Sequence, residues 1–260
     1  MTTTATSPAR APLDCIPSAL ITRPRRARRW PAISLSRAGR ASARFMSRPR
    51  APKGHPKSQK PLYTIGVLAD THVPDRVGEL HPLILPSLRR ARVTHIFHAG
   101  DICSSAVLTQ LGEVAPVTAV RGNRDWFVPG LPLVVETEIG GVQIALMHGH
   151  GGFARYLVDK ARYLISGYNL RRYLKLLTHT APNASVIIFG HTHYPESIWL
   201  REKLLLNPGS ASFGVEKMHV PTIAYLYIFQ DGSVKPKLQY LRGYKIVKRR
   251  WIRQIGTYIS

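Results

Sequence analysis

The chain has 260 residues, of which 44% are hydrophobic, so it can bury a sizeable core and is not a wholly disordered protein. Two cysteines, Cys15 and Cys103, exclude a disulfide framework and a Cys-x-x-Cys site, which favours a reducing, cytoplasmic compartment. The 37 basic residues far outnumber the 14 acidic ones, and no stretch reaches the roughly 18 apolar residues of a membrane span, so we expect none.

Residues 1–60 hold a disproportionate share of this charge, with 14 Lys and Arg residues and one acid, Asp14. Frequent Pro and Arg leave no helical or strand period, so we predict a disordered basic N-terminal segment. Three interpretations stay open. The first is that the segment is an organellar transit peptide, which would make the protein organellar. The second is that it is a basic arm that holds nucleic acid or anionic lipid. The third is that it is a functionless leader before a true start at Met46.

From residue 61 the pattern changes to apolar runs that alternate with helical stretches. Strands are expected over 62–69, 93–98 and 116–121, and helices over 79–92 and 104–112. This alternation predicts parallel strands in an α/β layer architecture.

The second half of the chain is expected to be mostly antiparallel. Gly140-Gly141 indicates a hairpin between strands over 133–138 and 142–147, and an amphipathic helical pattern over 153–178 is split near Gly167. Further strands are expected over 185–189, 197–206, 222–229 and 234–240. We therefore predict an α/β protein (an α+β sandwich), in which a two-sheet β-sandwich is flanked by helices.

The last residues mix basic and apolar side chains. We predict a domain over 61–243 and a basic C-terminal extension over 244–260. The extension is either a segment that contacts an interface or nucleic acid, or a strand or helix packed on the body, through apolar residues that include Ile246, Val247, Trp251 and Ile252.

Polar residues stand where five of the apolar runs end: Asp70-Thr71-His72, His98-Ala99-Gly100-Asp101, Arg121-Gly122-Asn123-Arg124-Asp125, His148-Gly149-His150 and Gly190-His191-Thr192-His193. Ligands gather at the carboxyl ends of strands in α/β sheets, so we expect these side chains at one edge. One such ending alone is explained by a turn or a capping residue, but five together are not. Carboxylate, imidazole and amide groups without thiolate suit divalent ions, and seven of them suit two ions that share a carboxylate.

In this order, Asp70-x-His72, Gly100-Asp101, Gly122-Asn123, His148 and Gly190-His191-x-His193 resemble the motifs of the calcineurin-like metallophosphoesterase superfamily. With Asn207-Pro208-Gly209-Ser210, they are most similar to its small prokaryotic phosphodiesterase branch, over residues 62 to about 240. The resemblance implies the four-layer architecture of that family and two divalent metal ions, with Mn²⁺ first and Ni²⁺, Fe²⁺, Zn²⁺ or Mg²⁺ as alternatives.

The resemblance also implies the residue roles. One metal would be held by Asp70, His72, Asp101 and His193, and the second by Asp101, Asn123, His148 and His191, with Asp101 bridging. A hydroxide between the ions would attack a small phosphodiester substrate. We expect Asn123 and His148, and with them Arg124, which is not part of the family pattern, to be the catalytic residues.

One position departs from the family pattern. Many members carry a histidine directly after Gly-Asn, where it protonates the leaving group, but this chain carries Arg124. Arginine does not release a proton at ordinary pH, so we expect a preference for good leaving groups such as aryl or nucleotidyl oxygens. Asp125 and His150 are alternative acids, or else a turn-capping residue and a solvated one.

Two other functions stay open. The first is a non-catalytic protein-interaction scaffold of the same fold, as the similar retromer subunit of eukaryotes is, although scaffolds can lose ligands and here all seven positions carry competent ones. The second is a nuclease that uses the basic tails to bind nucleic acid, which we favour less because nothing in the body resembles the large capping domains of DNA-processing relatives.

Overall fold

The computed structural model describes residues 59–149, 170–213 and 220–254. Most of the predicted basic segment over 1–60, the first part of the helical pattern over 153–178, and His150 lie outside these ranges. Within the described ranges, no helix combines the length and the apolar character needed to cross a membrane.

The first sheet has five strands in the order β10-β9-β1-β2-β3. β1, β2 and β3 are parallel, as the alternation of strands and helices predicted, whereas β9 pairs antiparallel with β1 on one side and with β10 on the other. The strands are β1 (Tyr63–Leu68), β2 (His95–His98), β3 (Val117–Ala119), β9 (Thr222–Ile228) and β10 (Val234–Tyr240). The crossovers between the parallel strands contain α1 (Ile84–Ala91) and α2 (Ser105–Gly112).

The second sheet has the order β4-β5-β6-β8-β7. Its strands are β4 (Val134–Ile139), β5 (Val142–Met147), β6 (Val186–Ile188), β7 (Pro195–Leu200) and β8 (Lys203–Pro208). The hairpin predicted at Gly140-Gly141 is confirmed, because β4 and β5 pair antiparallel around it. The single strand expected over 197–206 is wrong: the chain reverses at Arg201, whose φ is +56°, and β7 pairs antiparallel with β8.

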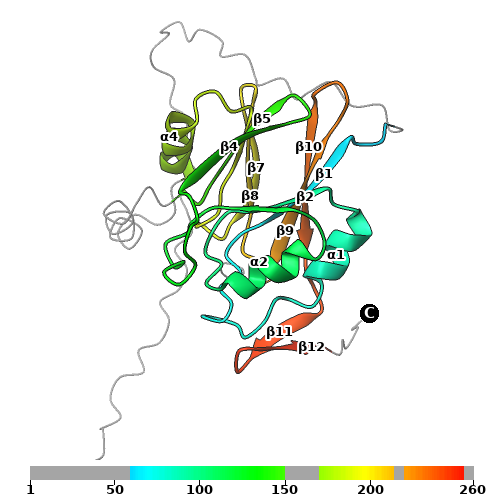
Figure 1. Ribbon diagram of the computed structural model, residues 1–260, viewed down its shortest axis with the longest axis vertical. Helices are drawn as coiled ribbons and strands as arrows, with labels where there is room; N and C mark the ends of the chain where they lie inside the picture. Colours follow the sequence, from blue (N-terminus) through cyan, green and yellow to red (C-terminus); the bar gives the residue numbers. More distant parts are fainter. Residues whose placement is uncertain (1–58, 150–169, 214–219, 255–260) are drawn as a thin grey trace, which may run out of the picture. The chain divides into compact units, whose positions relative to one another are not determined.

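The two sheets face each other, because strand side chains alternate between two faces. Ile65 and Val67 of β1 pack in one buried cluster with Leu146 of β5 and Leu206 of β8, which forms the core between the sheets. The opposite face of the first sheet packs on α1 and α2, and that of the second sheet packs on α4 (Leu170–Thr180). Helices therefore lie outside both sheets (Figure 1), which confirms the predicted sandwich.

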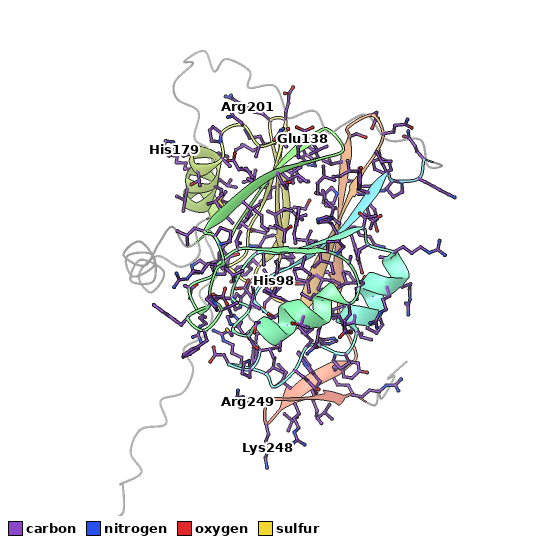
Figure 2. All side chains as sticks on the ribbon, in the orientation of Figure 1. His98, Glu138, His179, Arg201, Lys248 and Arg249 are labelled. Carbon is purple, nitrogen blue, oxygen red and sulfur yellow. The ribbon has the colours of Figure 1, made fainter. Side chains whose placement is uncertain are left out.

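The predicted C-terminal extension begins with a hairpin of β11 (Tyr244–Val247) and β12 (Arg250–Arg253). Trp251 is buried, and its indole N–H donates to the carbonyl of Glu79 at 3.0 Å. Lys248 and Arg249 form the tip of the hairpin, away from the sheets (Figure 2). The hairpin packs on the body through Trp251, whereas two of the four apolar residues proposed for that contact, Val247 and Ile252, are exposed.

Candidate metal centre

All seven predicted ligands lie together beyond the carboxyl ends of strands in both sheets. Each of the seven has a side-chain nitrogen or oxygen atom within 3.9 Å of such an atom in another member, and these contacts connect the whole set. The members are Asp70, His72, Asp101, Asn123, His148, His191 and His193. From Asp70 to His193 the set spans more than 120 positions in sequence, so the fold itself creates the cluster.

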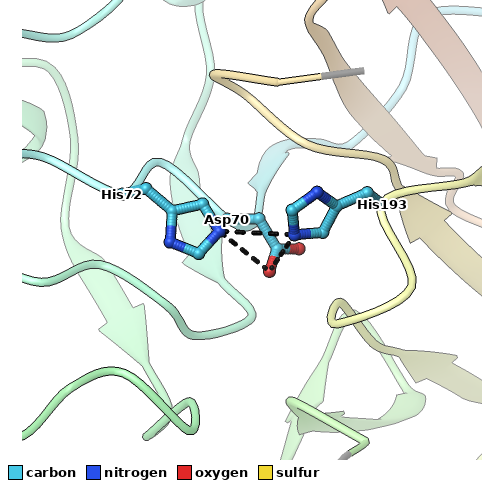
Figure 3. A group of neighbouring side chains, drawn as sticks. All are labelled: Asp70, His72 and His193. Carbon is cyan, nitrogen blue, oxygen red and sulfur yellow. Dashed lines mark hydrogen bonds and ion pairs between the residues drawn. The ribbon is translucent and has the colours of Figure 1, made fainter. Parts of the chain in front are cut away.

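The first half of the cluster is formed by Asp70, His72 and His193 (Figure 3). Nε2 of His193 lies 3.3 Å from Oδ1 of Asp70, and Nε2 of His72 lies 3.9 Å from the same oxygen. The two Nε2 atoms are 3.3 Å apart. Oδ1 of Asp70 is buried and accepts no hydrogen bond, which is costly for a carboxylate. A divalent cation among these three groups would satisfy that oxygen, so the donor set fits a metal.

The second half contains His148, whose tautomer is set by its surroundings. Its Nδ1 lies 2.7 Å from the carbonyl oxygen of Ala99, which can only accept, so Nδ1 carries the hydrogen. The other ring nitrogen, Nε2, then points an electron pair toward Oδ1 of Asp101 at 3.5 Å and Oδ1 of Asn123 at 3.0 Å. Oδ1 of Asn123 is also 3.0 Å from Nδ1 of His191. The electron pairs of His148, Asp101 and Asn123 thus face one another, as the ligands of a cation do.

Asp101 lies between the two halves. Its Oδ1 faces Nε2 of His148, and its Oδ2 lies 3.8 Å from Nε2 of His72. Each carboxylate oxygen therefore faces an imidazole from a different half of the cluster. This is the arrangement that a carboxylate shared between two ions requires.

The backbone of the cluster is unusual. Positive φ angles are uncommon for residues other than glycine and cost free energy, and they concentrate at functional sites. Here they occur at five predicted ligands: Asp70 (54°), His72 (49°), Asp101 (55°), His191 (71°) and His193 (61°). The backbone conformation is therefore held by the surrounding contacts, and it turns these side chains toward one another.

A close approach of two loops requires glycine at position 122. A Cβ atom on Gly122 would lie 2.1 Å from the backbone nitrogen of Asp101 and 2.2 Å from its Oδ1. No side chain fits at that distance, so the Gly122-Asn123 motif allows the loop after β3 to contact the loop after β2.

Asp125 ties these two loops together. Its carboxylate is buried and accepts four backbone N–H groups at 2.7–3.0 Å, those of Asp101, Ile102, Cys103 and Gly122. A carboxylate that accepts from four donors is engaged as a structural anchor, which favours the turn-capping interpretation of Asp125 over that of a general acid. The sequence alone left these two roles open.

The segment that begins at Asn207 supports two of the ligand loops. The amide Nδ2 of Asn207 donates to the carbonyl of Gly190 at 3.1 Å. The hydroxyls of Ser210 and Ser212 donate to the carbonyl of Asp70 at 2.9 and 2.8 Å. This segment therefore fixes the backbone of Asp70 and of the turn before His191, although it supplies none of the seven predicted ligands.

Burial and charge together set the ionisation of the cluster. Burial opposes ionisation of Asp70, but the imidazole of His193 and its neighbours outweigh it and hold the pKa below its usual range. Burial lowers the pKa of His72 to about 3, so its imidazole is neutral, as a metal ligand must be. Burial and the Asp101 carboxylate raise the pKa of Cys103 to about 12, so this thiol is no nucleophile at neutral pH.

Arg124 occupies the rim of the cluster. Its guanidinium pairs with the carboxylate of Asp75, and both side chains are about 41% exposed. Burial disfavours the charged guanidinium, but the hydrogen bond and charge of Asp75 outweigh this and raise the pKa of Arg124. Its side chain is thus a fixed positive charge beside the centre, whereas its backbone N–H donates to Oδ1 of Asp101 at 2.8 Å.

Comparison with known proteins matches residues 63–231 to the family model of the calcineurin-like phosphoesterase superfamily domain. A probable metallophosphoesterase of Methanothermobacter thermautotrophicus is 35% identical over 170 residues, which are 65% of this chain and 87% of that protein. Another from Methanocaldococcus jannaschii is 34% identical over 146 residues, 56% of this chain and 67% of that protein.

Among solved structures, wild-type Vps29 of Entamoeba histolytica in complex with Zn²⁺ is similar to this chain. The TM-score is 0.52 and the identity 26%, over 69% of this chain and 99% of Vps29. The two chains therefore share the two-sheet fold, and the similar protein binds a divalent metal.

Proposed function

The chain belongs to the calcineurin-like phosphoesterase superfamily, and on this premise we propose that it is a phosphodiesterase that uses two divalent metal ions. The coarser assignment, a metal-dependent phosphoesterase, is supported by the family match and by the archaeal relatives. The use of two ions and the preference for diesters are the finer parts of the proposal.

The observation that carries the proposal is the convergence of electron-pair donors on both sides of Asp101. On one side, Asp70, His72 and His193 would complete the first site with Asp101. On the other side, the second site would use Asp101 with Asn123, His148 and His191. No thiolate takes part, so the donor set suits Mn²⁺, Fe²⁺, Zn²⁺ or Ni²⁺.

Metal ions bound there would lower the pKa of water, which supplies the nucleophile, and would neutralise charge on the phosphoryl oxygens. The residues of the chain do the rest. The carbonyl of Ala99 orients His148, Asp125 holds the loop that carries Asp101, and Arg124 places a fixed positive charge at the rim. Preorganised charge of this kind is usually the largest contribution to catalysis.

The presence of arginine at position 124, where many relatives have a proton donor, favours diesters with good leaving groups. Guanidinium does not donate a proton at neutral pH, and the carboxylate of Asp125 is occupied by four backbone donors. Of the candidate acids that the structure describes, neither would protonate the leaving oxygen, which would then depart as an anion. Aryl and nucleotidyl oxygens do so more easily than alkyl oxygens.

The test begins with protein stripped by a chelator and reconstituted separately with Mn²⁺, Ni²⁺, Fe²⁺, Zn²⁺ or Mg²⁺. Hydrolysis of bis(4-nitrophenyl) phosphate should disappear on stripping and return with at least one ion. A rate that is independent of chelation, or no hydrolysis with any ion, would refute the proposal.

A protein-interaction scaffold of the same fold is the second candidate, since Vps29 is among the similar structures. The complete set of seven donors favours the enzyme, because a scaffold does not need them. A chain that binds metal with the predicted residues but hydrolyses no phosphate ester would support the scaffold instead.

A further inference from the structure

A pocket of about 650 Å³ lies directly beside the candidate metal centre. Asn123, a predicted ligand, lines it, and so does Cys103, whose Sγ lies 3.9 Å from Nδ1 of His72. The volume falls within the range of about 300–1,000 Å³ that is usual for small-molecule sites. A phosphate ester bound at the centre would thus have room for one substituent in this pocket.

Two aromatic side chains on the pocket wall are unusually exposed. Trp126 is 63% exposed and Phe127 is 88% exposed. The turn on which they stand is fixed at both ends, because Asp125 and Val128 are buried and the N–H of Val128 donates to the carbonyl of Asp125 at 3.3 Å. The fold therefore presents these two rings to the pocket, where they contribute little to the core.

The other lining groups are polar. Ser104 and Ser105 lie at the N-terminus of α2, where the Ser104 hydroxyl caps the helix by accepting the N–H of Ala106. The ion pair of Arg124 and Asp75 provides further donors and acceptors. A purely apolar group would displace water from these polar groups without hydrogen-bonding to them, whereas a flat ring with polar edges would suit both kinds of wall.

We propose that this pocket binds the nucleobase of a nucleotide ester, with Trp126 and Phe127 in contact with the faces of the base. The inference rests on the proposed function, because it places the phosphorus of the ester at the metal centre. It deepens that function by naming the substrate class: a nucleotide phosphodiester. Stacking of a base on an aromatic side chain supplies binding energy without requiring one particular base.

The experiment compares two esters with the same leaving group, 4-nitrophenyl thymidine 5′-phosphate and methyl 4-nitrophenyl phosphate. The Mn²⁺-loaded protein should have a kcat/KM about 10-fold higher on the nucleotide ester. The double variant Trp126→Ala, Phe127→Ala should bring the ratio of the two kcat/KM values close to one. The conservative pair Trp126→Phe, Phe127→Tyr should keep the ratio, because the rings are retained.

A binding measurement separates this inference from the proposed function. Calorimetric titration of the metal-loaded protein with thymidine 5′-monophosphate should show affinity about 10-fold weaker in the double alanine variant. The matched control is Tyr240→Ala on β10, a half-exposed aromatic outside the pocket, which should change neither measurement.

The outcomes are distinguishable. If neither ester is hydrolysed but nucleotide binding depends on Trp126 and Phe127, the proposed function and the substrate class fail, and the assignment of the pocket as a base-binding site stands. If both esters are hydrolysed and the double alanine variant leaves their ratio unchanged, or loses both rates equally, the inference is overturned. Absence of nucleotide binding to the metal-loaded wild-type protein would also overturn it.

Discussion

The buried centre and the exposed rim beside it are built in opposite ways. In the centre, Asp70, Asp101 and His148 are almost wholly inaccessible, and the backbone of Asp70 and Asp101 has positive φ angles. At the rim, Arg124 and Trp126 extend from a fixed loop into accessible space. A change in the centre therefore disturbs several groups at once, whereas a change at the rim should alter one property of the substrate.

The largest effect is expected for Asp101→Asn, which removes the charge shared by the two halves of the centre. Substitutions of residues that merely support metal ligands cost about 10- to 100-fold, so loss of this bridging charge should lower kcat/KM on bis(4-nitrophenyl) phosphate by more than about 100-fold. Steady-state kinetics with Mn²⁺ would measure it. The matched control is Asp231→Asn in the exposed turn between β9 and β10. Near-normal turnover of the Asp101 variant at equal metal occupancy would contradict the assignment.

A buried histidine outside both regions tests how burial makes stability depend on pH. His81 packs on the rings of Trp251 and Tyr244, and burial lowers its pKa from 6.5 to about 4. Between these values the unfolded chain binds a proton that the folded chain does not, so stability falls as the pH is lowered from about 6.5 to 4. The loss is up to roughly 3 kcal/mol.

The measurement is the free energy of unfolding by urea at several pH values, for the wild-type protein and for His81→Gln. The stability of the wild-type protein relative to His81→Gln should fall by roughly 3 kcal/mol between pH 7 and pH 4. The contribution of the metal-centre groups cancels in this difference, because both proteins contain them. A difference that does not vary with pH would show that His81 does not carry this effect.

Much of this architecture could be predicted from the sequence, and the exceptions have physical causes. The apolar run of β1 and the Gly140-Gly141 turn carry strong local signals. The turn at Arg201 carries none, because no glycine or proline marks it, and the β7–β8 hairpin was therefore expected as a single strand.

In the candidate site, too, some features have a local sequence signal and others have none. Polar residues at strand ends predicted which groups would gather, since parallel strands end at one edge. The anchoring role of Asp125 depends on backbone donors from another loop more than 20 residues earlier, which no local pattern reveals. The exposure of Trp126 and Phe127 is likewise a property of the folded turn.

Asp125→Asn should have an intermediate effect, because it tests the support of the centre without changing a predicted ligand. The neutral amide would accept more weakly and would turn an N–H group toward backbone donors, so the loop carrying Asp101 should shift. Metal affinity is expected to fall by about 10- to 100-fold, measured by calorimetric titration with Mn²⁺. Unchanged affinity would show that the loop is fixed without this carboxylate.

The smallest effect on stability is expected at the rim. Arg124→Ala removes an exposed ion pair with Asp75, which should change the free energy of unfolding by no more than about 1 kcal/mol. Rates for a series of aryl methyl phosphates should fall, yet the slope of log kcat against leaving-group pKa should stay the same, because Arg124 donates no proton. A distinctly steeper slope in the variant would mean that Arg124 takes part in protonation of the leaving group.

The most direct test of the central claim is the anomalous scattering of crystals grown with Mn²⁺. Two manganese peaks about 3.5–4 Å apart are expected, with the carboxylate of Asp101 in contact with both. One peak, no peak, or two peaks of which either lacks contact with Asp101 would contradict it.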